Sequence, residues 1–195
     1  SALTEAGMNT MVVDVGAHAL GRAVLACLPE LQTWDKPVGI VDIGASAMTF
    51  AALLKGEVVY SRLQNFGGDQ YSQALASFYS MSLDEAELAK VQGRLPADHE
   101  VDVLLPHLNT LVLQVKRNVQ LFCSSSGNKE LSKLVLTGGG SLLPGLVGQI
   151  GSELNCDVLH PDPFALFGKP KGEGGLIHGA KYMAAFGLAL RSFTP

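Results

Sequence analysis

The sequence predicts a mixed α/β domain in which three consecutive strands come before an alternation of helices and strands. Three observations support this fold class. Short apolar runs rich in β-branched residues are separated by tight turns near residues 38–63. A long segment near residues 104–122 carries apolar residues at helical spacing, and a glycine-rich segment follows a later apolar run. A length of 195 residues suits one such domain with a small additional flap.

Composition excludes several classes of protein. Hydrophobic residues make up 47% of the chain and charged residues 16%, which permits a sizeable core and is not typical of disorder. The net charge of −4 and the lack of a basic run argue against nucleic acid as a partner. Cys27, Cys123 and Cys156 are widely spaced and form no CxxC pair, so we expect reduced thiols. No apolar stretch approaches the roughly 20 residues of a membrane span.

The first three strands form an expected meander. Val38–Ile43 and Met48–Leu54 are apolar runs, and a third run covers residues 57–63. Lys55 and Gly56 form the expected tight turn between the second and third strands.

Two helices are expected after this meander. Gly67 and Gly68 interrupt the chain, and Asp69 is the expected N-cap of a helix that runs to about residue 78. Ser82 followed by Glu85 fits a capping box, which opens a short helix that reaches residue 90 or beyond. Residues 93–100 are polar, contain a proline and are expected to form a loop.

A long helix follows, with Pro106 in its first turn. Its apolar residues recur at intervals of three and four, as on a helix face packed against a sheet: Leu104, Leu108, Leu111, Val115, Val119 and Phe122.

The alternation then continues to the end of the chain. We expect a strand at 133–136, a helix at 144–154 opened by Pro144, a strand at Asp157–Leu159, a loop at 161–175 and a helix at 178–191. The complete order is βββα, a short helical insertion, then αβαβα. This order is the pattern of a ribonuclease-H-like half-domain, although order alone does not establish function.

The hairpin after the first strand is the first candidate binding site. Backbone amides of Gly44, Ala45 and Ser46 could hold phosphate oxygens, because such exposed amides form anion-binding concavities. Asp42 at the strand end could hold Mg²⁺ through water. The alternative is an ordinary hairpin with a glycine in its turn.

The second candidate is the loop Gly138, Gly139, Gly140 and Ser141, which lies between a strand and a helix. Three consecutive glycines cost conformational entropy, which favours a backbone that lies flat against a ligand. The alternative is a flexible connection. The motif is not a Walker A loop, because no Gly-Lys-Ser/Thr follows.

Two weaker candidates remain. Gly68 lies in the Gly-Gly-Asp segment at a helix start, where such residues commonly turn the chain. Lys116 and Gln120 share one face of the long helix, with Arg117 beside them, and could reach a ribose or adenine. A solvated helix face is the alternative. The five histidines are scattered and suggest neither a metal site nor a catalytic triad.

Taken in order, the Asp hairpin, Gly-Gly-Asp and Gly-Gly-Gly-Ser segments resemble the second phosphate loop and adenosine loop of the actin/Hsp70 superfamily. Within it the chain is similar to the PilM family of type IV pilus assembly proteins, with FtsA more distant. The most specific runs are DEAELAKVQGRLP (84–96) and GLALRSF (187–193). Residues 13–20 resemble the helix that connects two lobes, with Asp14 as its acidic lead residue. Lys116, Arg117 and Gln120 resemble the adenosine-side face of Hsp70-type proteins.

The resemblance implies a division of the chain. Residues 1–36 would be the end of a first lobe with the connecting helix, and 37–195 a second actin-like ATPase lobe with a helical subdomain near 81–103. We expect the chain to be a fragment, with the first phosphate loop and the PilN groove before Ser1.

The resemblance also implies a function. The full protein would bind ATP with Mg²⁺ between two lobes, as a scaffold required for pilus biogenesis and twitching motility. Its partners would be the cytoplasmic tail of PilN, held mainly by the missing lobe, and the pilus motor ATPases. Its place would be cytoplasmic, peripheral at the inner membrane. We expect at most a slow ATPase; the alternatives are a small-molecule kinase of the same superfamily and an interaction domain without nucleotide.

Overall fold

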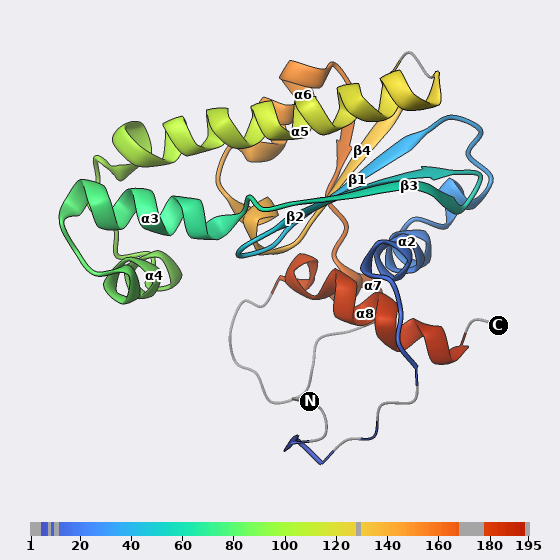
Figure 1. The fold of residues 1–195 in the computed structure, drawn as a ribbon, viewed down its shortest axis with the longest axis horizontal. Coiled ribbons are helices and arrows are strands. Elements are labelled where there is room, and N and C mark those ends of the chain that lie inside the picture. The colour runs from blue at the N-terminus through green and yellow to red at the C-terminus, as the bar shows by residue number, and fades with distance from the viewer. Residues whose placement is uncertain (1–4, 8, 10–11, 128–129, 168–177, 194–195) are drawn as a thin grey trace.

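The computed structural model describes residues 5–7, 9, 12–127, 130–167 and 178–193. A five-stranded mixed sheet with the order β3-β2-β1-β4-β5 forms its centre, and helices cover both faces (Figure 1). β1 pairs antiparallel with β2 and parallel with β4, and β5 continues the parallel side. The strands are β1 (Val38–Ile43), β2 (Met48–Leu54), β3 (Glu57–Gln64), β4 (Lys133–Thr137) and β5 (Asp157–Leu159). The predicted α/β fold class is confirmed, and each predicted strand is correct to within one residue.

Burial follows from the place of each strand in the sheet. β1 is central, and five of its six residues are buried, as expected of a strand covered on both faces. β3 is an edge strand, and its residues alternate between exposed and half-buried. The apolar run of β1 therefore reflects its central position in the sheet, and the alternating exposure of β3 reflects its position at the edge.

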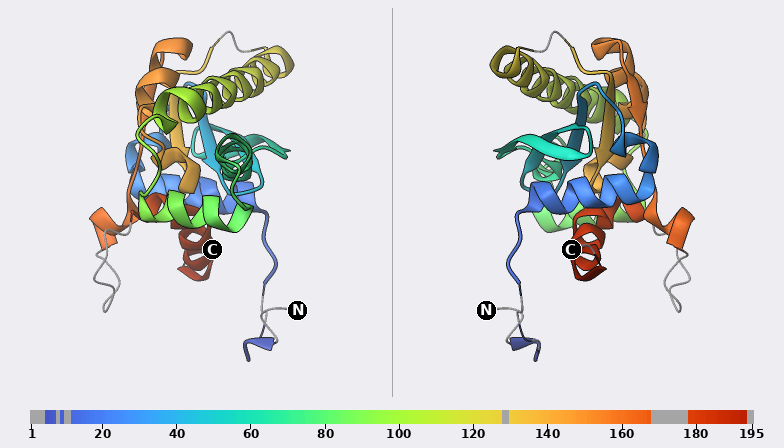
Figure 2. Two further views of the ribbon diagram at one scale, coloured as in Figure 1. Left: turned by 90° about the vertical axis from the view of Figure 1, so that its left-hand side faces the viewer. Right: turned by 90° about the vertical axis from the view of Figure 1, so that its right-hand side faces the viewer.

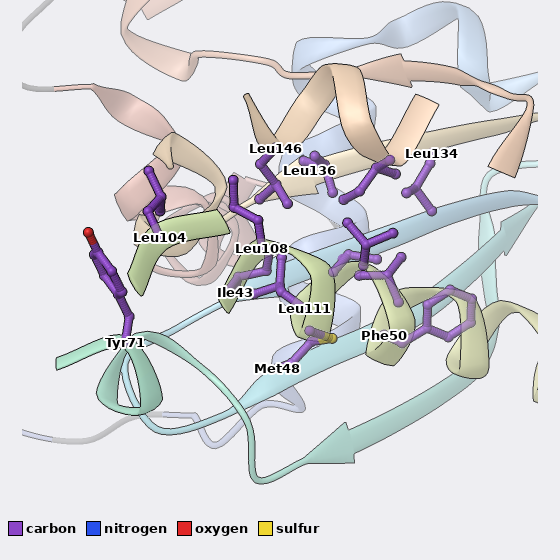
Figure 3. Close-up of a cluster of buried hydrophobic side chains, with 14 of the residues drawn as sticks. Ile43, Met48, Phe50, Tyr71, Leu104, Leu108, Leu111, Leu134, Leu136 and Leu146 are labelled. Carbon is purple, nitrogen blue, oxygen red and sulfur yellow. The ribbon is translucent and has the colours of Figure 1, made fainter. Parts of the chain in front are cut away.

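Helices on the two faces enclose two cores. α5 (Leu105–Ser126) and α6 (Leu146–Leu154) cover one face, while α2 (Gly16–Cys27) and α8 (Met183–Leu190) cover the other (Figure 2). Figure 3 shows the first core, where Ile43, Met48 and Phe50 of the sheet point toward Leu108 and Leu111 of α5.

A helical arm extends this first core beyond the sheet. It consists of α3 (Gly68–Tyr79), α4 (Leu83–Gln92) and a π-helix (Glu100–Leu104) that leads into α5. The predicted capping box opens α4: the Glu85 amide donates to Ser82 Oγ at 3.2 Å, and the Ser82 amide donates to Glu85 Oε2 at 2.8 Å. The predicted loop over 93–100 ends one residue earlier, because Glu100 begins the π-helix.

Two predicted helix starts are wrong by two residues. α3 begins at Gly68 with Gly67 as N-cap, and Asp69 lies in its first turn. The Gly67 amide donates to Gln70 Oε1 at 2.6 Å, which satisfies the helix start without an aspartate cap. α6 begins at Leu146 with Gly145 as N-cap, two residues after Pro144.

The C-terminal segment also differs from its prediction. Residues 163–167 form a short helix, α7 (Pro163–Phe167), inside the expected loop, and residues 168–175 of that loop lie outside the described part. The expected terminal helix is divided into a 3₁₀ turn (Gly179–Tyr182), α8 and a second 3₁₀ turn (Arg191–Phe193). Among the helices that the structure describes, none is both long and apolar enough to cross a bilayer.

Candidate functional site

Three loops meet at the carboxyl ends of β1 and β4. They are the hairpin after β1, the Gly67–Gly68 turn before α3 and the glycine loop after β4. β1 and β4 run parallel, with Asp42 opposite Thr137, so their carboxyl ends lie at one edge of the sheet. A crevice at this edge is where open α/β sheets bind their ligands.

Backbone hydrogen bonds join the hairpin to the start of α3. The Gly68 amide donates to the Gly44 carbonyl at 3.0 Å, and the Asp69 amide donates to the Ala45 carbonyl at 2.8 Å. A side chain on Gly67 would collide with the Ala45 carbonyl oxygen, so this contact requires glycine. The structure thus brings the predicted residue Gly68 to the hairpin, where its amide serves to hold the two loops together.

The hairpin offers two of the three predicted phosphate-binding amides. The Gly44 amide closes the turn by donating to the Ala47 carbonyl at 2.9 Å. The amides of Ala45 and Ser46 have no acceptor among the residues that the structure describes. Ala45 and Ser46 are both exposed, so an anion at the hairpin would meet these two groups first.

Asp42 is held at the base of this hairpin. Thr137 Oγ1 donates to Asp42 Oδ1 at 2.8 Å, and Thr137 is fully buried. Burial raises the pKa of the Asp42 carboxyl, and the Thr137 hydrogen bond partly opposes this increase. The second oxygen, Oδ2, has no hydrogen-bond partner within the described ranges, so it remains available to a hydrated cation.

The residues at this edge fit Mg²⁺ bound through one carboxylate, water and phosphate, and not through a cluster of protein ligands. No group of three or more histidine, cysteine or acidic residues that could hold a metal exists within the described part of the chain. Mg²⁺ is commonly bound through one or two carboxylates, several waters and phosphate oxygens, so one carboxylate beside free amides matches that pattern.

The glycine loop is shaped largely by the end of β1. A side chain on Gly138 would collide with backbone atoms of Ile43, and Gly138 has a φ of +84°. A side chain on Gly140 would collide with Ile43 Cγ2. Only Gly139 is open: it is exposed, and its nearest neighbour would be Lys181 Cγ at 4.0 Å. Two of the three glycines are therefore explained by packing, and only Gly139 leaves room for a ligand.

Ser141 lies inside the loop. Its hydroxyl donates to the Gly138 carbonyl at 2.6 Å and lies 2.8 Å from His160 Nε2. His160 stacks on His178 with ring centroids 5.0 Å apart, and burial together with His178 lowers the pKa of His160. Ser141 is buried, so its side chain stabilises the loop rather than lining an open pocket.

The remaining predicted residues lie elsewhere. Lys116 and Gln120 line a cavity at the amino ends of the strands, beside Trp34 and Cys156, and Lys116 pairs with Glu153 at 3.2 Å. β4 is five residues long, so the Cα atoms at its two ends are roughly 13 Å apart. Arg117 is exposed on the same helix. The structure therefore does not bring these three residues together with Asp42.

Asp14 joins α2 to the C-terminal segment. It lies two residues before α2, whose N-cap is Val15. Its carboxylate pairs with Arg22 and with Arg191, the latter at 3.1 Å, and the Arg22 hydrogen bond lowers the pKa of Asp14 despite its burial. All of these contacts tie α2 to the end of α8 and involve none of the three loops.

Sequence reasoning missed two residues at the site. Thr137 directly precedes the glycines and could have been found from the parallel register, which sets it opposite Asp42. Lys181 lies against Gly139 although 42 residues separate them, and no sequence pattern signals that contact.

Comparisons with known proteins agree with this arrangement. A family model described as type IV pilus assembly protein PilM matches residues 1–193. A solved PilM-PilN type IV pilus biogenesis complex is similar at 26% identity, with a TM-score of 0.80 over 100% of this chain and 56% of that one. EutJ from Carboxydothermus hydrogenoformans, an ethanolamine utilization protein, is similar at 22% identity and a TM-score of 0.67 (96% of this chain, 58% of that one). MreB5 of Spiroplasma citri bound to ADP is similar at 15% identity and a TM-score of 0.65 (96% and 61%).

These likenesses confirm the predicted actin-like fold. The second and third show the fold alone, because their identities are low. The chain spans a little more than half the length of these structures, at 56%, 58% and 61% of each.

Proposed function

Since the chain belongs to the PilM family of type IV pilus assembly proteins, we propose that it supplies one side of an ATP site in an actin-like scaffold of the pilus machinery. The observation that carries this proposal is the juxtaposition of Asp42 with the free amides of Ala45 and Ser46. A structural neighbour of the same fold is bound to ADP, which is consistent with nucleotide binding.

Each group has a role suited to its surroundings. The amides of Ala45 and Ser46 would bind phosphate oxygens, and Asp42 would hold Mg²⁺ through water by its Oδ2 atom. Thr137 fixes the orientation of Asp42 by donating to its other oxygen. Gly139 leaves space for the nucleoside, with the Lys181 stem beside it. Mg²⁺ supplies neutralisation of phosphate charge and fixes the geometry of the phosphates.

In this role nucleotide binding changes which partner surface is presented, and turnover is slow or absent. A ligand shifts such an equilibrium only through its differential affinity for the two states. By the family resemblance the proposed partners are the PilN cytoplasmic tail and the pilus motor ATPases, at the cytoplasmic face of the inner membrane. The solved complex with PilN supports the first of these partners.

Thermal unfolding with and without Mg-ATP tests the site, on this chain and on the longer protein. Ligand at 100 times its Kd stabilises by about 2.7 kcal/mol, which raises Tm by about 5–11 °C for a domain of this size, at about 2–4 °C per kcal/mol. Asp42→Ala should abolish the shift. Gly139→Ala should weaken it while leaving the apo Tm nearly unchanged, because no neighbouring atom obstructs the added methyl group.

The outcomes separate the alternatives. A shift in the longer protein alone supports a site shared between two lobes. No shift in either protein contradicts nucleotide binding and favours an interaction domain. Substrate-dependent phosphate transfer across a panel of sugars would instead identify a small-molecule kinase.

A further inference from the structure

The groove between α3 and α5 is a second candidate binding surface, separate from the β1 hairpin. The two helices lie against each other beyond the end of the sheet (Figure 1). A cavity of about 370 Å³ lies between them, bounded by Phe66, Ala74 and Phe78 on one side and by Asp102, Pro106 and His107 on the other.

The floor of the groove is apolar and uncharged at neutral pH. His107 is stacked between Phe66 and Tyr71, with ring centroids 5.7 Å and 5.2 Å away. Burial lowers the pKa of His107 to about 4, so its ring is neutral. Its Nε2 atom is buried and has no hydrogen-bond partner in the described structure. Phe78 at the wall is 53% exposed, so it adds accessible apolar surface to the groove.

The wall on the other side is formed by a π-helix. π-helices are rare and occur frequently at functional sites. Here the π-helix (Glu100–Leu104) places Asp102 and Val103 at the groove. Neither Glu100 nor Asp102 has a basic partner among the ion pairs of the described residues.

The segment that supplies Asp102 to the groove is strongly acidic. Residues 81–103 contain six acidic and two basic side chains, a net charge of −4 that equals the net charge of the whole chain. The acidic residues are Asp84, Glu85, Glu87, Asp98, Glu100 and Asp102. Apolar side chains are also exposed on this arm, including Leu88 at 57% and Val91 at 79%. An anionic lipid surface would be repelled by this arm, whereas a cationic partner with an apolar face would be attracted.

We propose that the groove between α3 and α5 binds a basic amphipathic helix of a partner protein. Its apolar face would lie on Phe66, Ala74 and Phe78, and its Lys or Arg residues would face Asp102 and the acidic arm. Helix-in-groove recognition uses this combination of apolar anchors and complementary charge. The proposal does not depend on nucleotide binding at the β1 hairpin.

The first test uses defined peptides with the full chain. A labelled helical peptide of about 16 residues, with Leu along one face and Lys elsewhere, is titrated by fluorescence anisotropy. Two controls have the same Leu and Lys residues in shuffled order, or Glu in place of every Lys. We expect the amphipathic basic peptide to bind at least about tenfold more tightly than either control. Equal binding of the shuffled peptide, or no binding of the basic one, overturns the proposal.

Protein variants then locate the binding. Asp102→Lys should weaken the basic peptide about tenfold or more, and Phe78→Ser should weaken it by removing an apolar wall. Glu57→Lys is the matched control, because Glu57 is an exposed acid on β3. Equal losses for Asp102→Lys and Glu57→Lys would indicate nonspecific charge attraction and refute the groove. Circular dichroism and Tm of each variant exclude loss of fold, and an unchanged Mg-ATP shift separates this test from that of the nucleotide site.

Discussion

Replacement of Gly138 by alanine should destabilise the fold through an unfavourable backbone conformation and a steric collision. Gly138 has a φ of +84°, and an added Cβ would collide with backbone atoms of Ile43. Gly145 has a similar φ of +80° but nothing within 4 Å of the added atom. Their ψ angles differ, however: Gly145 is left-handed helical with a ψ of −15°, whereas Gly138 has a ψ of 167°, a conformation that is essentially restricted to glycine. Gly145→Ala therefore measures the cost of a left-handed residue alone, and Gly138→Ala measures the cost of its own conformation together with the collision.

The magnitudes follow from these two situations. A left-handed conformation costs a non-glycine residue about 1–2 kcal/mol, which is the expected loss for Gly145→Ala. The conformation of Gly138 costs a non-glycine residue about 1–3 kcal/mol, and displacement of a packed backbone adds about 1–3 kcal/mol, so Gly138→Ala should lose about 2–6 kcal/mol in total. Both substitutions reduce the entropy of the unfolded chain equally, so this effect cancels in their difference.

Urea unfolding followed by circular dichroism measures both variants. If the free energy of unfolding falls with urea concentration at the same slope in each variant as in the wild type, their unfolded states are comparable. The midpoints of unfolding then report differences in stability. Gly138→Ala should be less stable than Gly145→Ala by at least about 1 kcal/mol. Equal losses, or a larger loss for Gly145→Ala, would refute the reasoning that the backbone conformation of Gly138 and its contact with β1 require glycine there.

Three further predictions concern charged and titrating groups. Asp42→Asn should raise the apo Tm at pH 7, because burial raises the folded pKa of Asp42 and makes its ionised form unfavourable, while the Mg-ATP shift is lost. The unfolded chain binds a proton at His107 from about pH 6.5 downward and the folded chain only near pH 4, so stability should fall by about 2 kcal/mol between pH 7 and pH 5. His107→Phe should remove that part of the pH slope in urea titrations, and His99→Gln should not. Asp14→Asn should lower Tm at pH 7, since Asp14 pairs with Arg22 and Arg191, and the difference from wild type should vanish as pH falls through the lowered pKa of Asp14. A difference in Tm that persists at the acid end would contradict the ion-pair explanation.

Local sequence patterns predicted the strands well because the burial of a strand in a sheet determines which residues in a short run are apolar. β1 is apolar throughout since both of its faces are covered, and β5 was placed with both ends correct. The start of α4 was also predictable, because the Ser82 cap is satisfied by a residue three positions away.

Helix starts that depend on distant residues were not predictable. Asp69 has the right side chain for an N-cap, but the helix begins earlier because hairpin carbonyls 24 residues away accept from its first amides, Gly68 to Gly44 and Asp69 to Ala45. The Lys116 and Gln120 pair shows the same limit for sites. Helical spacing fixed their common face, yet it gave no information on which end of the sheet that face would meet.

The site residues illustrate why glycines alone do not identify a ligand. Gly67, Gly138 and Gly140 each approach the chain's own hairpin or β1 so closely that a side chain would collide, so their identity is explained without nucleotide. Gly139 has no such neighbour, and the amides of Ala45 and Ser46 lack acceptors in the described structure. The argument for binding therefore rests on groups that the fold leaves unused, and on Asp42, whose burial is tolerated beside Thr137 at the same edge. Because three loops are joined there by backbone contacts, a ligand at the hairpin would act on the β1 end and the start of α3 together.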